Sequence, residues 1–263
     1  MGDHVSEIRP SVTDGLYIKD LSHAYGDELV LKGIECSLPM GSLVAVLGPS
    51  GCGKTTLLKI CAGLIAPSSG SIQINGANPL QARSKGIVGF AFQSPTLLPW
   101  RTALENILLP LEILNKGIDA ESRDFARNLL TLVGLEDKGD TYPRELSGGM
   151  QQRIGLARAL VTNPSALFLD EPFGQLDPKT RDKLNEKVRE IWQRYSLNML
   201  FVTHSVSEAV FVADKVIILS KQPASIVETI DIDLGEERTH STKANPRYPK
   251  LERIIDDILE REA

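Results

Sequence analysis

The amino-acid sequence predicts an α/β fold built on a mainly parallel β-sheet, and three observations support this prediction. Short apolar runs at residues 166–169, 199–203 and 216–219 have the length of buried strands. Helical patterns separate these runs, and buried strands that alternate with helices are typical of a parallel sheet covered on both faces. A helix-rich stretch, residues 95–161, interrupts the alternation, so we expect a helical lobe inserted into the α/β domain.

The remaining elements follow from turn residues and from the apolar period. Strands are expected at residues 16–25, 29–38, 43–47, 71–75 and 87–93. A helix is expected from Gly53, where the apolar period changes, to about Gly63. After the helical stretch we expect a long polar-faced helix at residues 177–195, a last strand at 216–219 and an amphipathic helix beyond Arg247. The polar face of that amphipathic helix carries both signs of charge, which favours packing onto its own domain over binding to a membrane surface.

The composition is that of an ordinary globular protein. The chain has 263 residues, of which 42% are hydrophobic and 24% are charged, enough for a sizeable core. Its net charge of −5 argues against broad nucleic-acid binding, which needs a basic surface. No apolar run approaches the ~18 residues of a membrane span, and residues 1–10 lack the apolar segment of a secretory signal. Because Cys36, Cys52 and Cys61 have neither disulfide nor metal-site spacing, we expect a reducing compartment.

The stretch GPSGCGKTT has the spacing of a phosphate-binding loop and lies between an expected strand and an expected helix. Its residues are Gly48, Pro49, Ser50, Gly51, Cys52, Gly53, Lys54, Thr55 and Thr56. Glycines let backbone N–H groups approach a phosphate without Cβ clashes, and a helix N-terminus favours negative charge. Lys54 is expected to reach the β- and γ-phosphates, and the Thr55 hydroxyl to bind Mg²⁺. The stretch therefore predicts nucleotide binding without identifying the reaction.

Two adjacent carboxylates, Asp170 and Glu171, follow the apolar run ALFL. Ligands of parallel sheets bind at the carboxyl ends of the strands. Asp170 is expected to hold Mg²⁺, directly or through water, and Glu171 to polarise a water for attack on the γ-phosphate. Alone, the pair would as often be a solvent-facing strand end. Next to a phosphate loop, the catalytic interpretation is favoured.

The stretch LSGGMQQRIGLARAL begins a helix in an unusual way. Ser147 is a good N-cap, but Gly148 and Gly149 occupy the first turn, where each glycine costs up to ~1 kcal/mol relative to alanine. Met150 stands where a capping box would have Glu or Gln, so N–H groups stay free. Such a helix start lets a phosphate approach the backbone.

Together, LSGGMQQR, LFLDEP and the phosphate loop resemble the signature, Walker B and Walker A motifs of ABC-type ATPases. The resemblance covers residues 16–219 in the family's motif order. It implies a P-loop NTPase (RecA-like) core with an N-terminal antiparallel β subdomain and an inserted α-helical subdomain. The implied division places the core with its β subdomain at residues 16–94 and 162–235, the helical signature subdomain at 95–161, and a C-terminal tail and helix at 236–263.

The resemblance assigns further roles to single residues. Tyr25 matches the aromatic residue that stacks on adenine, and Gln93 matches the glutamine that touches Mg²⁺ and the attacking water. His204 matches the histidine that contacts the γ-phosphate, and Asp177 matches an aspartate at the subunit interface. Without the resemblance, Tyr25 would be interpreted as a half-buried strand residue and His204 as structural. Gln175 departs from the family pattern, which has a small residue at that position.

The resemblance also implies a mechanism, namely ATP hydrolysis by a head-to-tail dimer of identical or different ATPase subunits. Lys54, Thr55 and Asp170 of one subunit would hold ATP and Mg²⁺, while Ser147 and Gly149 of the other complete the γ-phosphate site. Closing and reopening of the dimer would drive separate integral membrane permease subunits. The chain is then expected as a peripheral subunit on the cytoplasmic face of the cell (inner) membrane, related only indirectly to an external solute-binding protein.

Within the family, AFQSPTLLPWRTALENILLPLEI is similar to the nitrate/sulfonate/taurine importer branch. One alternative is a soluble ABC ATPase of translation or DNA maintenance, for which residues 95–144 are too short to hold a coiled-coil or zinc-bearing arm. A second is a non-catalytic scaffold, against which the intact Lys54, Asp170, Glu171 and His204 argue. A third, closer rival is the ATPase of an exporter that is not fused to its membrane domain.

Overall fold

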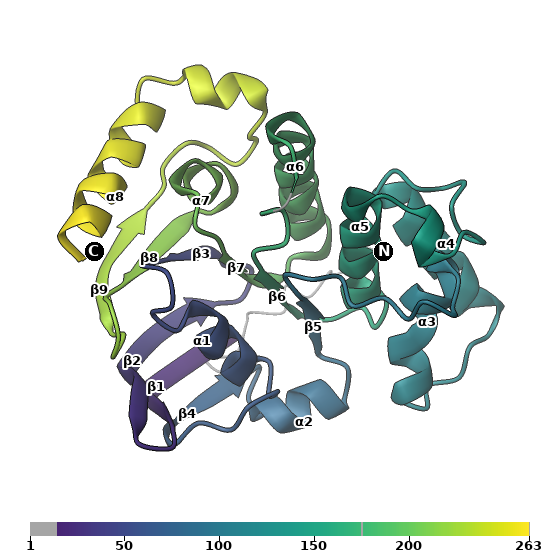
Figure 1. Ribbon diagram of the computed structural model, residues 1–263, viewed down its shortest axis with the longest axis horizontal. Coiled ribbons are helices and arrows are strands. Elements are labelled where there is room, and N and C mark those ends of the chain that lie inside the picture. The colour runs from purple at the N-terminus through teal and green to yellow at the C-terminus, as the bar shows by residue number, and fades with distance from the viewer. Residues whose placement is uncertain (1–14, 175, 263) are drawn as a thin grey trace, which may run out of the picture.

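The computed structural model describes residues 15–174 and 176–262. Gln175 and the N-terminal residues 1–10, for which no secretory signal is expected, lie outside the described residues. Figure 1 shows two regions, a β-sheet region flanked by helices and a purely helical lobe beside it.

The described strands form two sheets. A three-stranded antiparallel sheet with the order β2-β1-β4 consists of β1 (Gly15–Tyr25), β2 (Glu28–Pro39) and β4 (Ser69–Ile74). A six-stranded sheet with the order β5-β6-β7-β3-β8-β9 consists of β3 (Leu43–Leu47), β5 (Val88–Ala91), β6 (Ala166–Asp170), β7 (Asn198–Val202), β8 (Lys215–Leu219) and β9 (Ile226–Asp231). Its first five strands pair in parallel, whereas β9 is antiparallel to β8. The predicted mainly parallel sheet and the antiparallel N-terminal sheet are both confirmed.

Helices cover the six-stranded sheet and also form the separate lobe. Those that border the sheets are α1 (Lys54–Cys61), α2 (Pro79–Ser84), α6 (Pro178–Tyr195), α7 (Val206–Val212) and α8 (Tyr248–Glu262). The lobe consists of α3 (Ala103–Ile113), α4 (Ala120–Leu132), the short 3-10 helix η1 (Pro143–Glu145) and α5 (Gly148–Leu160). A second 3-10 helix, η2 (His240–Ala244), precedes α8. The lobe stands to the side of the sheet and approaches it where α5 lies along β5 (Figure 1).

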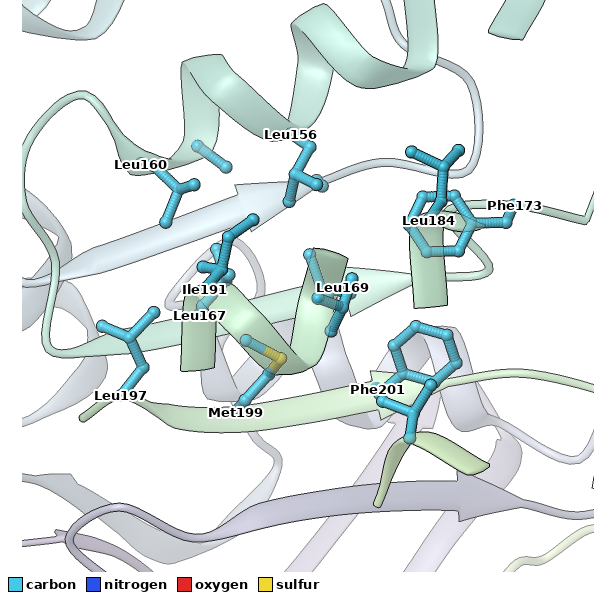
Figure 2. Packing of buried hydrophobic residues seen from close by; sticks show 14 of the residues in the cluster. Leu156, Leu160, Leu167, Leu169, Phe173, Leu184, Ile191, Leu197, Met199 and Phe201 are labelled. Atoms are coloured by element: carbon cyan, nitrogen blue, oxygen red, sulfur yellow. The ribbon is translucent and has the colours of Figure 1, made fainter. Parts of the chain in front are cut away.

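Alternate residues of the central strands pack into different cores, as expected for a sheet that is buried on both faces. Leu167 and Leu169 of β6 pack with helices α5 and α6 (Figure 2). Ala166 and Phe168 of the same strand pack instead with α1 and the antiparallel sheet. This double burial keeps the strand ends rigid at the edge where the candidate site lies.

The sequence did not predict β9 or the short helices α2 and α7. In β9 every residue is exposed or only partly buried, so the strand lacks the apolar alternation by which half-buried strands are recognised. Helix α2 has a capping box between Asn78 and Gln81 and begins with Pro79, but its six residues hold no full apolar period. The expected last strand at 216–219 is therefore followed by one more, which forms the edge of the sheet.

The amphipathic C-terminal helix α8 packs onto its own domain, as predicted. Tyr248, Ile255 and Ile258 are buried in the core, and the Tyr248 hydroxyl donates to the carbonyl of Ser207 in α7 at 2.7 Å. None of the helices in the described part of the chain combines the length and the apolar character that a bilayer span requires.

Candidate active site

The phosphate loop joins the buried strand β3 to the N-terminus of α1. Gly53, the N-cap residue of α1, has φ 115°, a conformation that residues with a side chain rarely adopt. A Cβ atom at this position would lie 2.9 Å from side-chain carbons of Val30 and Leu31. Because no side chain caps α1, the N–H groups of its first turn remain available to an anion.

A cavity of about 450 Å³ lies at this helix start. The residues that line it are Gly48, Ser50, Gly51, Gly53, Lys54, Thr55, Thr56, Gln93, Glu171 and His204. Pro49 and Cys52 belong to the loop but do not line the cavity. The Cys52 thiol is buried instead, which raises its pKa. The structure thus brings together the phosphate loop and three of the residues expected from other parts of the sequence.

The Lys54 side chain is buried beneath the loop. Its ammonium group donates to the carbonyl oxygens of Gly48 at 2.8 Å and Pro49 at 2.9 Å. An ammonium group has three N–H donors, so these two bonds orient the lysine and leave one donor for a phosphate oxygen. Holding the charge inside the loop gives the cavity a positive centre for a polyphosphate.

Thr55 and Asp170, two of the three residues expected to hold Mg²⁺ together with Gln93, contact each other directly. The Thr55 hydroxyl donates to Asp170 Oδ1 at 2.8 Å, which brings the end of β6 against the first turn of α1. Burial raises the pKa of the Asp170 carboxyl, and the adjacent Glu171 raises it further, against the lowering effect of the Thr55 hydrogen bond. A hydroxyl and a carboxylate fit Mg²⁺, which binds few protein oxygens and completes its shell with phosphates and water. The buried carboxylate would therefore gain a counter-charge when the ion binds.

Gln93 and His204 converge on the Glu171 carboxylate. Gln93 Nε2 donates to Glu171 Oε2 at 3.0 Å, and His204 Nδ1 lies 3.3 Å from the same oxygen. Among the described residues, Glu171 Oε1 receives no hydrogen bond, so it keeps its lone pairs for a water. Glu171 itself has a φ of 43°, a strained conformation for a residue with a side chain and one that is typical of functional sites. This geometry suits a general base held in one orientation.

The other predicted site residues lie away from this cavity. Tyr25 is half exposed at the end of β1 and makes an edge-to-face contact with His23. Ser147 and Gly148 lie exposed at the start of α5, where the Ser147 hydroxyl accepts from the N–H of Met150 at 3.3 Å. Asp177 caps α6 by accepting from the N–H of Thr180. Hydrogen bonds from the side chain and the backbone of Thr180 lower the pKa of the Asp177 carboxyl. Gly149, beside Ser147, also does not line the cavity, so these residues do not join the phosphate loop within one chain.

Two side chains of α5 that the sequence reasoning did not single out hold the segment around Gln93. Gln152 is buried, and its Nε2 donates to the Gln93 carbonyl at 2.5 Å. Arg158 donates to the carbonyls of Pro95 at 2.6 Å and Thr96 at 3.1 Å. Gln152 could have been recognised from the sequence, because it is a polar residue one helical turn from the apolar Leu156 and therefore lies on the apolar face of the helix.

Comparison with known proteins identifies the family of the chain. The sequence model described as ABC transporter matches residues 31–174, which is more than half of the chain. The chain therefore belongs to the ABC transporter family, and it is an ATPase of that family.

Relatives and solved structures extend the match to most of the chain. The taurine import ATP-binding protein TauB of Escherichia coli O157:H7 is 39% identical over 254 residues, which are 94% of this chain and 98% of that protein. The nitrate import ATP-binding protein NrtD of Synechocystis sp. is 38% identical over 255 residues, 93% of this chain and 94% of that protein. A dimeric ATP-binding cassette in a post-hydrolysis state, bound to ADP and Pi, has a TM-score of 0.75 at 30% identity and covers 82% of this chain and 98% of its own. The predicted P-loop NTPase fold and the resemblance to the nitrate and taurine importer branch are both confirmed.

Proposed function

We propose that the chain is the ATPase subunit of an importer that drives uptake of a small solute, of the nitrate, sulfonate or taurine type, through a separate permease. The observation that carries the proposal is the convergence of Gln93 and His204 on Glu171, beside the Thr55–Asp170 pair. The names of the relatives, which are import ATP-binding proteins for taurine and nitrate, support the direction of transport and the class of solute.

In the proposed reaction the chain positions ATP and activates a water. The N–H groups of the loop and Lys54 bind the β- and γ-phosphates, which places the γ-phosphate in the cavity next to Glu171. Thr55, Asp170 and Gln93 are the residues that would hold Mg²⁺, which would supply positive charge to the phosphates when bound. Glu171 accepts a proton from the water whose oxygen attacks the γ-phosphorus, while the bond from that phosphorus to the β–γ bridging oxygen breaks and ADP leaves. Gln93 and His204 keep the Glu171 carboxylate oriented towards that water.

The second half of each site comes from a partner subunit in this proposal. Ser147, Gly148 and Gly149 would supply N–H groups to the γ-phosphate of the partner, and Asp177 would lie at the same interface. Tyr25 would stack on the adenine ring. Support comes from the exposed position of Ser147 and Gly148 and from the dimeric state of the structural neighbour. A Cβ atom at Gly148 would meet nothing within 4 Å, so the fold itself has room for a larger residue there.

An apolar groove of about 390 Å³, where the helical lobe meets β5, is the proposed contact for the permease. Its lining includes Phe90, Phe92, Leu109, Ile113 and Arg158. Ile113 is 69% exposed, and Phe92 immediately precedes the catalytic-site residue Gln93. A permease segment seated in the groove would thus act one residue away from the Glu171 network. The chain would then lie on the cytoplasmic face of the membrane as a peripheral subunit, without contacting an external solute-binding protein.

Recovery of the full-length tagged chain from membranes of its own cells tests this proposal. We expect an integral membrane permease to co-purify, and we expect Ile113→Glu to reduce its recovery while the ATPase rate of the isolated chain is unchanged. Ile254→Glu, at a half-exposed isoleucine of α8 outside the groove, is the matched control and should leave recovery unchanged. Recovery of a ribosome or DNA complex without a permease would contradict the proposal, as would equal effects of the two variants.

A further inference from the structure

A chain of polar side chains connects the backbone beside Asp177 with the backbone on both sides of His204. It begins at Arg181, in the first turn of α6. One end of the Arg181 guanidinium, Nη2, donates to the carbonyl of Leu176 at 2.9 Å and reaches the carbonyl of Gly174 at 3.5 Å. Gly174 and Leu176 precede Asp177 in the chain, so Arg181 contacts the backbone beside the residue that the proposed function places at the partner interface.

The other edge of the guanidinium forms an ion pair. Arg181 Nε lies 3.4 Å from Glu208 Oε1, and the Glu208 side chain is only 7% exposed. A planar guanidinium presents its N–H donors in a rigid fork, so one edge can face the carbonyls while another faces a carboxylate. Because the glutamate is buried, its charge depends on Arg181 for compensation.

Glu208 also contacts the residues on either side of His204 through Thr203. Its second oxygen, Oε2, accepts a hydrogen bond from the hydroxyl of Thr203, a buried residue directly before His204. The same Thr203 oxygen accepts from the N–H of Ser205 at 3.0 Å, directly after His204. The backbone is therefore held on both sides of the histidine by one hydroxyl group, which Glu208 orients.

His204 needs such support because packing does not hold its ring. Its side chain is 59% exposed, yet its Nδ1 has to stay within 3.3 Å of Glu171 Oε2. We propose that Arg181 and Glu208 are positioning residues that set the orientation of His204 according to the position of the segment that leads to Asp177. The inference rests on the proposed function, in which His204 and Asp177 act in hydrolysis and at the dimer interface.

The experiment measures steady-state ATP hydrolysis and ATP binding for the full chain and its Arg181→Gln, Glu208→Gln and double variants. Each single variant is expected to lower kcat about 10- to 100-fold, the loss typical of a misplaced catalytic group, with the KM for ATP unchanged. The double variant should be no slower than the singles, because one connection is broken in all three. Lys243→Gln is the matched control, since it breaks an ion pair to Asp182 in the same region without touching Glu208, and it should keep the wild-type kcat.

A second background separates a positioning role from a general structural one. In a His204→Ala chain, which we expect to be slow, Glu208→Gln should cause no further loss of kcat. An equal additional loss in that background, or a wild-type kcat for Glu208→Gln in the intact chain, would overturn the proposed connection alone. A wild-type rate for His204→Ala itself would refute the role of His204 in the proposed function and the connection with it.

Should Glu208→Gln fail to fold, Thr203 offers the same test with less disturbance. Thr203→Ser keeps the hydroxyl and is expected to retain kcat, whereas Thr203→Val keeps the shape, loses the hydroxyl and is expected to lose kcat as Glu208→Gln does. Equal rates for these two folded variants would overturn the proposal.

Discussion

The N-termini of α1 and α5 are alike in sequence and opposite in surroundings. Glycine lies at both starts, as the N-cap Gly53 of α1 and as the first residue Gly148 of α5, and neither helix has an acidic residue in its first turn. At α1 the left-handed Gly53 opens into a cavity that contains Lys54 and Glu171. At α5 the N-cap Ser147 and its neighbour Gly148 face outwards, away from that cavity. The start of α1 can therefore bind a phosphate together with other residues of its own chain. The start of α5 lacks such residues around it and could contact only a phosphate bound to another molecule.

The largest expected effect comes from Glu171→Gln, which removes the proposed base from the α1 site and preserves its shape. Hydrolysis should fall by about 10²- to 10⁴-fold, the usual contribution of a general base. ATP binding should persist, because the phosphate loop is unchanged, and the variant should accumulate as an ATP-bound dimer in size-exclusion chromatography. An unchanged hydrolysis rate would show that Glu171 is not the base.

Mixing two inactive variants tests whether the α5 helix start serves the site of a partner. Lys54→Ala removes the phosphate-loop cation, and Ser147→Arg blocks the start of α5 while leaving ATP binding to the monomer intact. In a mixed dimer, the phosphate loop of the Ser147→Arg chain meets the unaltered α5 of the Lys54→Ala chain, which forms one complete site. We expect hydrolysis to reappear on mixing, measured as phosphate release. The unmixed variants serve as controls, and a mixture as inactive as its components would contradict the proposal that the start of α5 serves the site of a partner.

The smallest expected effect concerns the stability of the α1 site. Because the pKa of Asp170 is raised in the fold, the folded state binds its proton more readily than the unfolded state does. Its ionised form therefore lowers the free energy of unfolding at pH values above the raised pKa. Asp170→Asn removes the buried charge and should raise the free energy of unfolding at pH 7 by about 0.5–2 kcal/mol, the usual gain from a stabilising substitution. The Tm should rise by a few degrees.

The pH dependence checks the cause of this gain. The advantage of Asp170→Asn should shrink as the pH falls through the raised pKa, because the wild-type carboxyl then takes up its proton. Asp177→Ala is the control of opposite sign, since it removes an N-cap whose pKa is lowered, and it should lower the free energy of unfolding at pH 7. Thermal unfolding of both variants without nucleotide, followed from acidic to neutral pH, measures the two effects. A gain for Asp170→Asn that grows at acidic pH would contradict the assignment to a buried charge.

Much of the site was predictable because its chemistry is local in the chain. The loop from Gly48 to Thr56 needs only glycine backbone freedom, a lysine and a hydroxyl at fixed spacing, and all of these are visible in the sequence. The apolar run before Asp170 and Glu171 likewise indicated a buried strand that ends in two carboxylates. The edge strand β9 was not predictable in this way, because its exposed residues leave no periodic signal.

The sequence by itself therefore determined the fold class, the phosphate loop and the helix start at Ser147, since each depends on short-range pattern and backbone geometry. Only the tertiary structure decided how the distant groups meet. Three neighbouring strands of the sheet, β5, β6 and β7, are followed by Gln93, Glu171 and His204 respectively. In the sequence, Gln93 lies 78 positions and His204 33 positions from Glu171. The ion pair of Arg181 with Glu208 depends in the same way on α6 packing against α7. Strand order and helix packing arise from the burial of whole elements, so no local spacing records them.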